Sequence, residues 1–220
     1  FSEPIRLIKH SFENETDHKL IISKGSSGGL YSQIMNGAPL DIFLSADQNL
    51  PLKLEKNKKG IFGTRFTYAR GKLKLLSFNK KLLNKMFPKV LTSGHVKYIG
   101  IGNPLFVPYG YAAKEVLTTI GLTKKISNKL ILGKNVNQVF LMSYLGNLDL
   151  AFVSHSDIKS KNNNKKGIIW EISQDFYSPI NQDAILLLPG SQKKGAKEFM
   201  HFLKSDFIKK KIRDYGYEVD

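Results

Sequence analysis

Residues 25–29 combine two serines with three glycines in the order Gly-Ser-Ser-Gly-Gly. The stretch fits G-x-S-x-G, the turn that exposes a serine nucleophile in many hydrolases. It also fits a glycine-eased turn at the start of a helix, where backbone N–H groups and hydroxyls bind an anion. Ser27 would attack a substrate in the first case, whereas it would only donate a hydrogen bond in the second.

A hydrolase interpretation of Ser27 finds little support elsewhere in the sequence. Only one predicted helix and one predicted strand precede Ser27, and a loop of the HGGG type is absent. His155 and His201 follow the serine, but His155 comes directly after a predicted strand and His201 lies on a helix with a surface pattern. A serine hydrolase therefore stays the less favoured alternative.

Two further turns have the composition of an anion site. Pro108 and Gly110 shape the turn VPYG, where the N–H group of Tyr109 stands at a predicted helix start. In KNVNQ, Asn135 suits an N-cap and Val136 offers its N–H group. Helix N-termini favour negative charge, and in parallel sheets they gather at the carboxyl edge. The turns therefore predict one oxyanion site made of neutral donors.

The three turns contain hydrogen-bond donors and no carboxylate, which bears on the choice of anion. Monoprotonated phosphate carries a proton that needs an acceptor, whereas molybdate, tungstate and sulfate are fully deprotonated at neutral pH. Composition does not separate these three anions. Asp41 and Asp47 flank a predicted buried strand, and we expect them to cap or brace neighbouring turns.

Hydrophobic periodicity places helices and strands in alternation along the chain. We expect helices at 4–14, 30–37, 48–56, 110–121 and 135–147, and one or two more in the last thirty residues. We expect strands at 19–23, 40–47, 71–78, 96–104, 149–154, 167–173 and 183–190. In the helix at 30–37, Leu30, Ile34 and Met35 should face inward. Such alternation predicts an α/β fold with parallel sheets and helices on both faces.

Composition limits the class of protein. The chain has 220 residues, 41% of them hydrophobic, which is enough to bury a substantial core, and it has no apolar run of membrane-spanning length. Cysteine is absent, which excludes disulfides and thiolate metal sites. The net charge of +16 comes from scattered bases without interleaved aromatic residues, so we expect a solvated lysine coat and no nucleic-acid partner. The Lys/Asn-rich tract at 159–166 predicts an exposed loop.

Four blocks of the sequence resemble the periplasmic molybdate-binding proteins of ABC importers. The blocks are GSSGGLYSQIMNGAPLDIFLSAD, IGNPLFVPYGYAAKEVL, NVNQVFLMSYLGNLDLAFVS and YSPINQDAILL. The resemblance implies a two-lobed binding-protein fold of type II, with parallel-rich sheets and a ligand cleft between the lobes. Lobe 1 would comprise residues 1–72 and 185–220, and lobe 2 would comprise residues 73–184. The segments 71–78 and 181–190 are the expected two-strand hinge.

The same resemblance implies ligand residues and partners. Ser27 would donate its hydroxyl and N–H group, and Tyr109 and Val136 would donate N–H groups. Ser26 adds a hydroxyl in the first turn, and Ser154 occupies the place of a ligand tyrosine at the end of LAFVS. The ligand would be molybdate or tungstate, with no cofactor and no metal site. The protein would be a periplasmic monomer that is not an enzyme and that serves an ABC transporter permease.

Three function classes stay open at this point: a binding protein for this or another oxyanion such as sulfate, a Ser27 hydrolase, and the ligand-sensing domain of a regulator. A helix-turn-helix, which a regulator would carry, is not evident in the sequence. Family members also have a first strand and a small polar turn with a further donor. The residues after Phe1 resemble the helix that follows that turn. Either the printed sequence is incomplete or the anion is bound differently.

Overall fold

The computed structural model describes residues 1–160 and 166–220, which divide into two compact units. Unit 1 comprises Phe1–Gly71 and Asn181–Asp220, and unit 2 comprises Lys72–Ile180. The sequence placed the two divisions after residues 72 and 184. The predicted loop at 159–166 lies for the most part outside the described residues. No helix in the described ranges is long and apolar enough to cross a bilayer.

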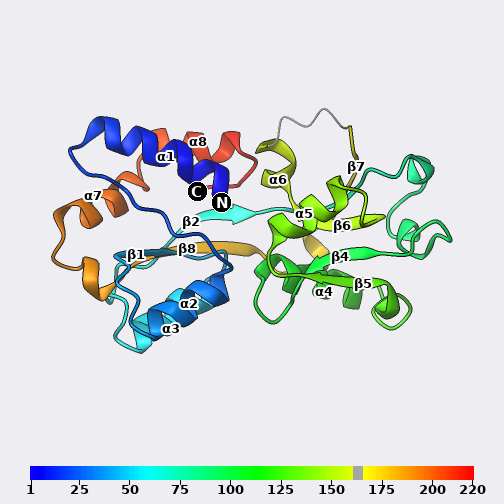
Figure 1. The fold of residues 1–220 in the computed structure, drawn as a ribbon, viewed down its shortest axis with the longest axis horizontal. Helices are drawn as coiled ribbons and strands as arrows, with labels where there is room; N and C mark the ends of the chain where they lie inside the picture. The colour runs from blue at the N-terminus through cyan, green and yellow to red at the C-terminus, as the bar shows by residue number, and fades with distance from the viewer. Residues whose placement is uncertain (161–165) are drawn as a thin grey trace. The chain divides into compact units, whose positions relative to one another are not determined.

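Unit 1 contains a three-stranded sheet with helices on both faces (Figure 1). Its strand order is β1-β8-β2, and β1 runs antiparallel to β8. The elements are α1 (Ser2–Glu15), α2 (Ser27–Met35), β1 (Ile42–Leu44), α3 (Asn49–Lys56), β2 (Phe66–Gly71), β8 (Ile180–Leu186), α7 (Lys194–Phe202) and α8 (Asp206–Asp214).

Successive side chains of β1 point to opposite faces of the sheet and pack into two separate hydrophobic clusters of unit 1. Ile42 and Leu44 pack against a cluster formed with α1, α7 and α8, whereas Phe43 belongs to the cluster formed with α2 and α3. The buried members include Ile8, Phe12, Phe199, Ile208 and Ile212 in the first cluster, and Ile34, Leu54 and Ile185 in the second. Each such side chain contributes roughly 1.5–3 kcal/mol on burial.

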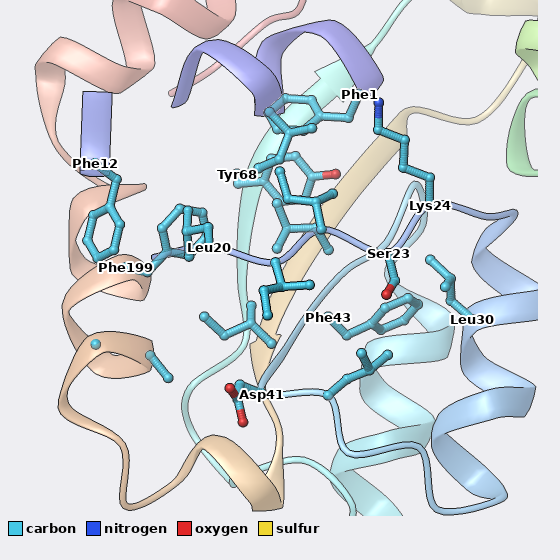
Figure 2. A pocket seen from close by; sticks show the side chains of 18 of the residues that line it. Phe1, Phe12, Leu20, Ser23, Lys24, Leu30, Asp41, Phe43, Tyr68 and Phe199 are labelled. Atoms are coloured by element: carbon cyan, nitrogen blue, oxygen red, sulfur yellow. The ribbon is translucent and has the colours of Figure 1, made fainter. Parts of the chain in front are cut away.

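The predicted strand at 19–23 is wrong, because these residues form no strand. A strand needs a neighbour for its backbone hydrogen bonds. A cavity of about 730 Å³ is lined both by residues 18–25 and by residues 39–44, which include β1 (Figure 2). Ile21 is 98% exposed. The segment therefore runs past the sheet without joining it.

Met35 in α2 also departs from the prediction. It is exposed, whereas Ile34 is buried and Leu30 is half-buried. Met35 follows Ile34 by one position, which rotates its side chain by about 100° away from the buried stripe. Gly37 follows the helix with a positive φ of 90°, as expected for the residue that ends it.

Unit 2 contains a five-stranded sheet in the order β5-β4-β6-β3-β7. The elements are β3 (Leu73–Ser77), β4 (Ile99–Gly102), α4 (Pro108–Thr119), β5 (Leu130–Gly133), α5 (Val136–Tyr144), β6 (Leu150–Ser154), α6 (His155–Ser160) and β7 (Ile168–Glu171). Strand β4 pairs parallel with β5 and β6, whereas β3 pairs antiparallel with β6 and β7.

The sheets are therefore more mixed than the predicted parallel-rich sheets. The parallel pairs belong to strand–helix–strand units, in which a helix returns the chain to the same edge. Strand β3 follows β2 directly, without such a crossover helix. The alternation of strands and helices therefore does not predict whether β3 runs parallel or antiparallel to its neighbours.

Helices on both faces of the unit 2 sheet were predicted, and the structure confirms them. Along β6, Leu150 and Phe152 share a cluster with residues of α4, while Ala151 and Val153 share one with residues of α5. The two helices therefore cover opposite faces, and the alternation of β6 sends its side chains to both.

Candidate functional site

Residues 25–29 span the N-terminus of α2 in unit 1, which begins at Ser27. Ser26 is the N-cap, with extended backbone, and its Oγ accepts a hydrogen bond of 3.2 Å from Gly29 N. Serine is favoured there because its oxygen satisfies one of the orphan N–H groups of the first turn. In the described part of the chain, the N–H groups of Ser27 and Gly28 have no acceptor.

The hydroxyl of Ser27 is fixed by a residue that is distant in sequence. Its Oγ accepts a hydrogen bond of 3.0 Å from Ala46 N, and Ser27 is 8% exposed. No hydrogen bond joins Ser27 to a histidine among the described residues, although a hydrolase needs a general base within reach of the serine. The contact joins the start of α2 to the turn after β1.

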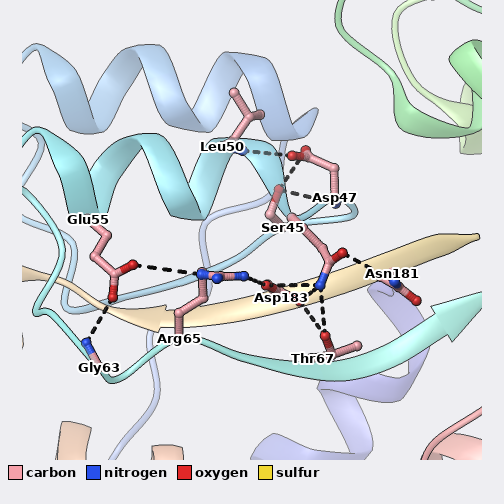
Figure 3. A network of polar contacts seen from close by, with 10 residues as sticks. Ser45, Asp47, Leu50, Glu55, Gly63, Arg65, Thr67, Asn181 and Asp183 are labelled. Carbon is pink, nitrogen blue, oxygen red and sulfur yellow. Dashed lines mark hydrogen bonds and ion pairs between the residues drawn. The ribbon is translucent and has the colours of Figure 1, made fainter.

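A polar network holds that turn, residues 45–47, in place (Figure 3). Ser45 is fully buried, and its Oγ donates to Asp47 Oδ2 at 2.9 Å. Asp47 Oδ1 accepts from Leu50 N at 2.8 Å in the first turn of α3. The expectation that Asp47 caps a neighbouring turn is therefore confirmed.

Buried Asp183 on β8 is a further member of this network and accepts several of its hydrogen bonds. Its carboxylate accepts from Arg65 Nη1 at 2.5 Å and from Thr67 Oγ1 at 2.6 Å, and it lies 3.2 Å from Gln48 Nε2. Its backbone oxygen accepts from Ser45 N at 2.9 Å. A carboxylate without solvent contact needs such partners, because an unpaired buried charge is very costly.

Tyr68 on β2 also belongs to the network, through its phenol hydroxyl. Its hydroxyl donates toward Ser45 O at 3.2 Å and toward Gln182 Oε1 at 3.1 Å. Burial raises the pKa of Tyr68 well above its ordinary value, with smaller contributions from Tyr217, Asp183 and Asp47. The phenol therefore stays protonated and keeps its role as a donor.

In unit 2, Tyr109 lies at the N-terminus of α4, where Pro108 takes the first helical position. Proline suits that position, because its missing N–H would be unbonded there in any case. A Cβ on Gly110 would lie 2.0 Å from Gly102 O, so only glycine lets α4 approach β4 this closely. Tyr109 itself is buried.

Val136 is the first residue of α5, and the start of this helix is capped from both directions. Asn135 Oδ1 accepts from Gln138 N at 2.8 Å, while Gln138 Oε1 accepts from Lys134 N at 2.7 Å. The expectation that Asn135 is the N-cap is confirmed. In the part of the chain that the structure describes, the N–H group of Val136 has no acceptor.

Ser154 ends β6 and is buried, but its hydroxyl already has partners. It donates to Asp157 Oδ2 at 2.7 Å, accepts from Asp157 N at 3.1 Å and lies 3.0 Å from Ser156 Oγ. A hydroxyl has a single proton. Ser154 would therefore have to give up Asp157 to donate to a ligand, which the sequence did not reveal.

Three of the predicted residues belong to one edge of the unit 2 sheet. Strands β4, β5 and β6 are mutually parallel, with Gly102 opposite Gly133. Tyr109 and Val136 start the helices that follow β4 and β5, and Ser154 is the last residue of β6. Carboxyl ends of parallel strands lie at the same edge, which is the usual place for ligands in such sheets.

Other ionisable groups of unit 2 lie on β3 and just after β6. Burial lowers the pKa of Lys74, with a smaller effect from Lys72, and Lys74 pairs with Glu171. The pKa of His155 is also lowered, first by burial and then by Lys74, Lys159 and Lys72. Among the described residues, no group of three or more His, Asp or Glu side chains is placed to hold a metal ion.

Comparisons with known proteins place these features in context. The model of the family described as bacterial extracellular solute-binding protein matches residues 1–218. The molybdate-binding protein ModA of Azotobacter vinelandii is 39% identical over 217 residues, which cover 99% of this chain and 86% of the relative. ModA of Rhodobacter capsulatus is 36% identical over 220 residues, which cover 100% and 85%. The solved Azotobacter vinelandii periplasmic molybdate-binding protein superposes with a TM-score of 0.92 at 34% identity, covering 99% of this chain and 94% of that one.

Proposed function

Because the chain belongs to the bacterial extracellular solute-binding protein family, we propose that it captures molybdate or tungstate outside the cytoplasm. The protein then delivers the anion, unchanged, to the permease of an ABC transporter. It acts as a monomer in the periplasm, without a cofactor and without a nucleic-acid partner. Relatives named for molybdate binding, at 36% and 39% identity over nearly the whole chain, support this choice of ligand.

The observation that carries the proposal is that the first N–H groups of two helices have no acceptor in the described part of the chain. Ser27 begins α2 and Val136 begins α5, and in the described part of the chain neither N–H group has an acceptor. Free N–H groups at the positive end of a helix bind anions. We propose that the Ser27 N–H and hydroxyl donate to the bound anion, and Val136 and Tyr109 stay predicted ligands. Ser26 and Ser154 stay predicted ligands of the same anion.

The donor set favours a fully deprotonated oxyanion. The hydroxyl and N–H groups of Ser27 and the N–H of Val136 are neutral, and Asp47, a carboxylate of the neighbouring turn, already accepts from Ser45 and Leu50. A monoprotonated phosphate would lack an acceptor for its proton, which costs affinity because a buried donor is left unsatisfied. Sulfate also satisfies this condition, and a sulfate-binding protein is the alternative within the same class.

Calorimetry with sodium molybdate tests the role of Ser27. We expect Ser27→Ala to weaken binding by roughly 1–3 kcal/mol, since a hydrogen bond to a charged group is lost. Ser32→Ala is the matched control, because Ser32 lies on the same helix and its hydroxyl bonds to Gly28 O instead. Unchanged molybdate affinity in Ser27→Ala would contradict the proposal.

The hydrolase alternative is tested with an activated ester. Ser27 lacks a histidine partner among the described residues, so we expect ester turnover to be no faster than in Ser27→Ala. Turnover that disappears on Ser27→Ala would instead make the protein an enzyme.

A further inference from the structure

Ser45 makes several of the hydrogen bonds that fix the turn of residues 45–47. Its N–H donates to Asp183 O at 2.9 Å, its carbonyl oxygen accepts from Tyr68, and its hydroxyl donates to Asp47 Oδ2. Every polar atom of this buried serine therefore has a partner. The residue after it, Ala46, is the one that donates to Ser27.

Both carboxylate oxygens of Asp47 are used inside the protein. Oδ2 accepts from the Ser45 hydroxyl and Oδ1 accepts from Leu50 N at the start of α3 (Figure 3). The negative charge thus lies at the N-terminus of α3, where the helix dipole stabilises it. Asp47 therefore links Ser45 to the start of α3 through both of its carboxylate oxygens.

The hydrogen bond from Ala46 decides what the Ser27 hydroxyl can do. A serine hydroxyl has one proton and two lone pairs. Since Ala46 N–H occupies a lone pair at 3.0 Å, the proton of Ser27 is directed away from Ala46. We infer that Asp47 is a positioning residue for anion capture: it fixes residues 45–47, so that Ala46 holds the Ser27 hydroxyl as a donor.

This inference rests on the proposed function, and it adds a residue that does not touch the anion. Tyr68 and Asp183 support the same turn, but both are buried in the core of unit 1, so their replacement would disturb much else. Asp47 is half-buried, and the side-chain hydrogen bonds described for its carboxylate go to Ser45 of the turn and to Leu50 of α3. It is therefore the member of the network whose removal reports on the turn itself.

A double-mutant cycle of Asp47→Ala and Ser27→Ala, titrated with sodium molybdate by calorimetry, tests the inference. In the otherwise unchanged chain we expect Asp47→Ala to weaken binding roughly 3- to 10-fold, as for one lost neutral hydrogen bond. In the Ser27→Ala background we expect less than about a twofold change, because neighbouring residues that act through one group are not additive. Amide exchange at Ala46 should become faster in Asp47→Ala.

A capping control separates positioning from general loss of stability. Ser205 caps α8 in unit 1 by accepting from Ile208 N, so Ser205→Ala removes a cap far from the turn in sequence. We expect Ser205→Ala to lower the melting temperature as Asp47→Ala does and to leave molybdate affinity unchanged.

The other outcomes contradict the inference, and they show whether the proposed function fails with it. If Ser27→Ala weakens binding and Asp47→Ala does not, the inference fails and the proposed function stands. The same holds if Asp47→Ala weakens binding equally in both backgrounds, since Asp47 would then act independently of Ser27. If the unchanged chain binds no molybdate, the proposed function and the inference fail together.

Discussion

Unit 1 offers a side-chain hydroxyl beside a backbone N–H at Ser27, whereas unit 2 offers the backbone N–H of Val136 at the start of α5. The hydroxyl of Ser27 depends on a network of side chains that ends at buried Asp183. The position of the Val136 N–H depends on the cap that Asn135 provides at the start of α5. The position of α4 depends on its close packing against β4 at Gly110. Side-chain donors are therefore sensitive to polar substitutions, and backbone donors are sensitive to packing and to proline.

The largest effect is expected when the network of unit 1 loses its buried charge. Asp183→Ala removes the buried carboxylate that Arg65, Thr67 and Gln48 share, and we expect a loss of about 3–5 kcal/mol in the free energy of unfolding. Urea unfolding measures it. Asp17→Ala, at an exposed site, should change stability by less than about 0.5 kcal/mol. A similar small change for Asp183→Ala would show that the network is not essential.

The second-largest effect is expected from a substitution that disturbs the packing of α4 against β4 in unit 2. Gly110→Ala would place a methyl group 2.0 Å from Gly102 O, a backbone atom that cannot rotate away. We expect a loss of about 1–3 kcal/mol from overpacking, measured by urea unfolding. Gly94→Ala is the control, since a Cβ there has no neighbour within 4 Å. Equal stability of the two variants would contradict the close approach of α4 to β4.

Proline removes the backbone donor of Val136 with little damage to α5. Val136 is the first helical residue and Asn135 before it is extended, which are the conditions that proline requires. We expect Val136→Pro to weaken molybdate binding by about 1.5 kcal/mol, roughly tenfold, with an unchanged melting temperature of the free protein. Lys194→Pro, at the first residue of α7, is the control. Full affinity in Val136→Pro would exclude this N–H as a ligand.

The smallest effect concerns pH and is confined to unit 2. The folded pKa of His155 is lowered by burial and by nearby lysines, so protonation favours the unfolded chain. Stability should therefore fall as the pH drops below about 6.5, the ordinary value for histidine, and the loss is complete below the lowered folded pKa. His155→Gln should reduce this acid-side loss in chemical unfolding, whereas exposed His201→Gln should not. An identical pH profile for both variants would refute the assignment.

Sequence patterns predicted most of the helices, because apolar spacing and capping residues are local signals. Helices α2, α4 and α5 are examples, with Asn135 confirmed as an N-cap. Strands were harder, because pairing partners come from distant parts of the chain. The segment 19–23 has a strand composition but lies beside a cavity.

Some elements carried too weak a local signal to be found. Strands β2 and β5 and helix α6 were not predicted, and β8 begins at Ile180, three residues before the predicted start. Of the predicted site, the Asn135 cap could be found from sequence, but the contact of Ala46 with Ser27 spans 19 positions. The bond of Ser154 to Asp157 was also missed, although the spacing of three residues is that of an N-cap.

Thermal unfolding of the unchanged chain with molybdate, tungstate, sulfate and phosphate tests most directly whether neutral donors select a deprotonated oxyanion. At about a thousand times its dissociation constant, a bound anion adds roughly 4 kcal/mol, which raises the melting temperature by about 8–16 °C for a chain of this size. We predict such a rise with molybdate or tungstate and none with phosphate. A rise with phosphate as large as with molybdate, or no rise with any of the four, would contradict the account.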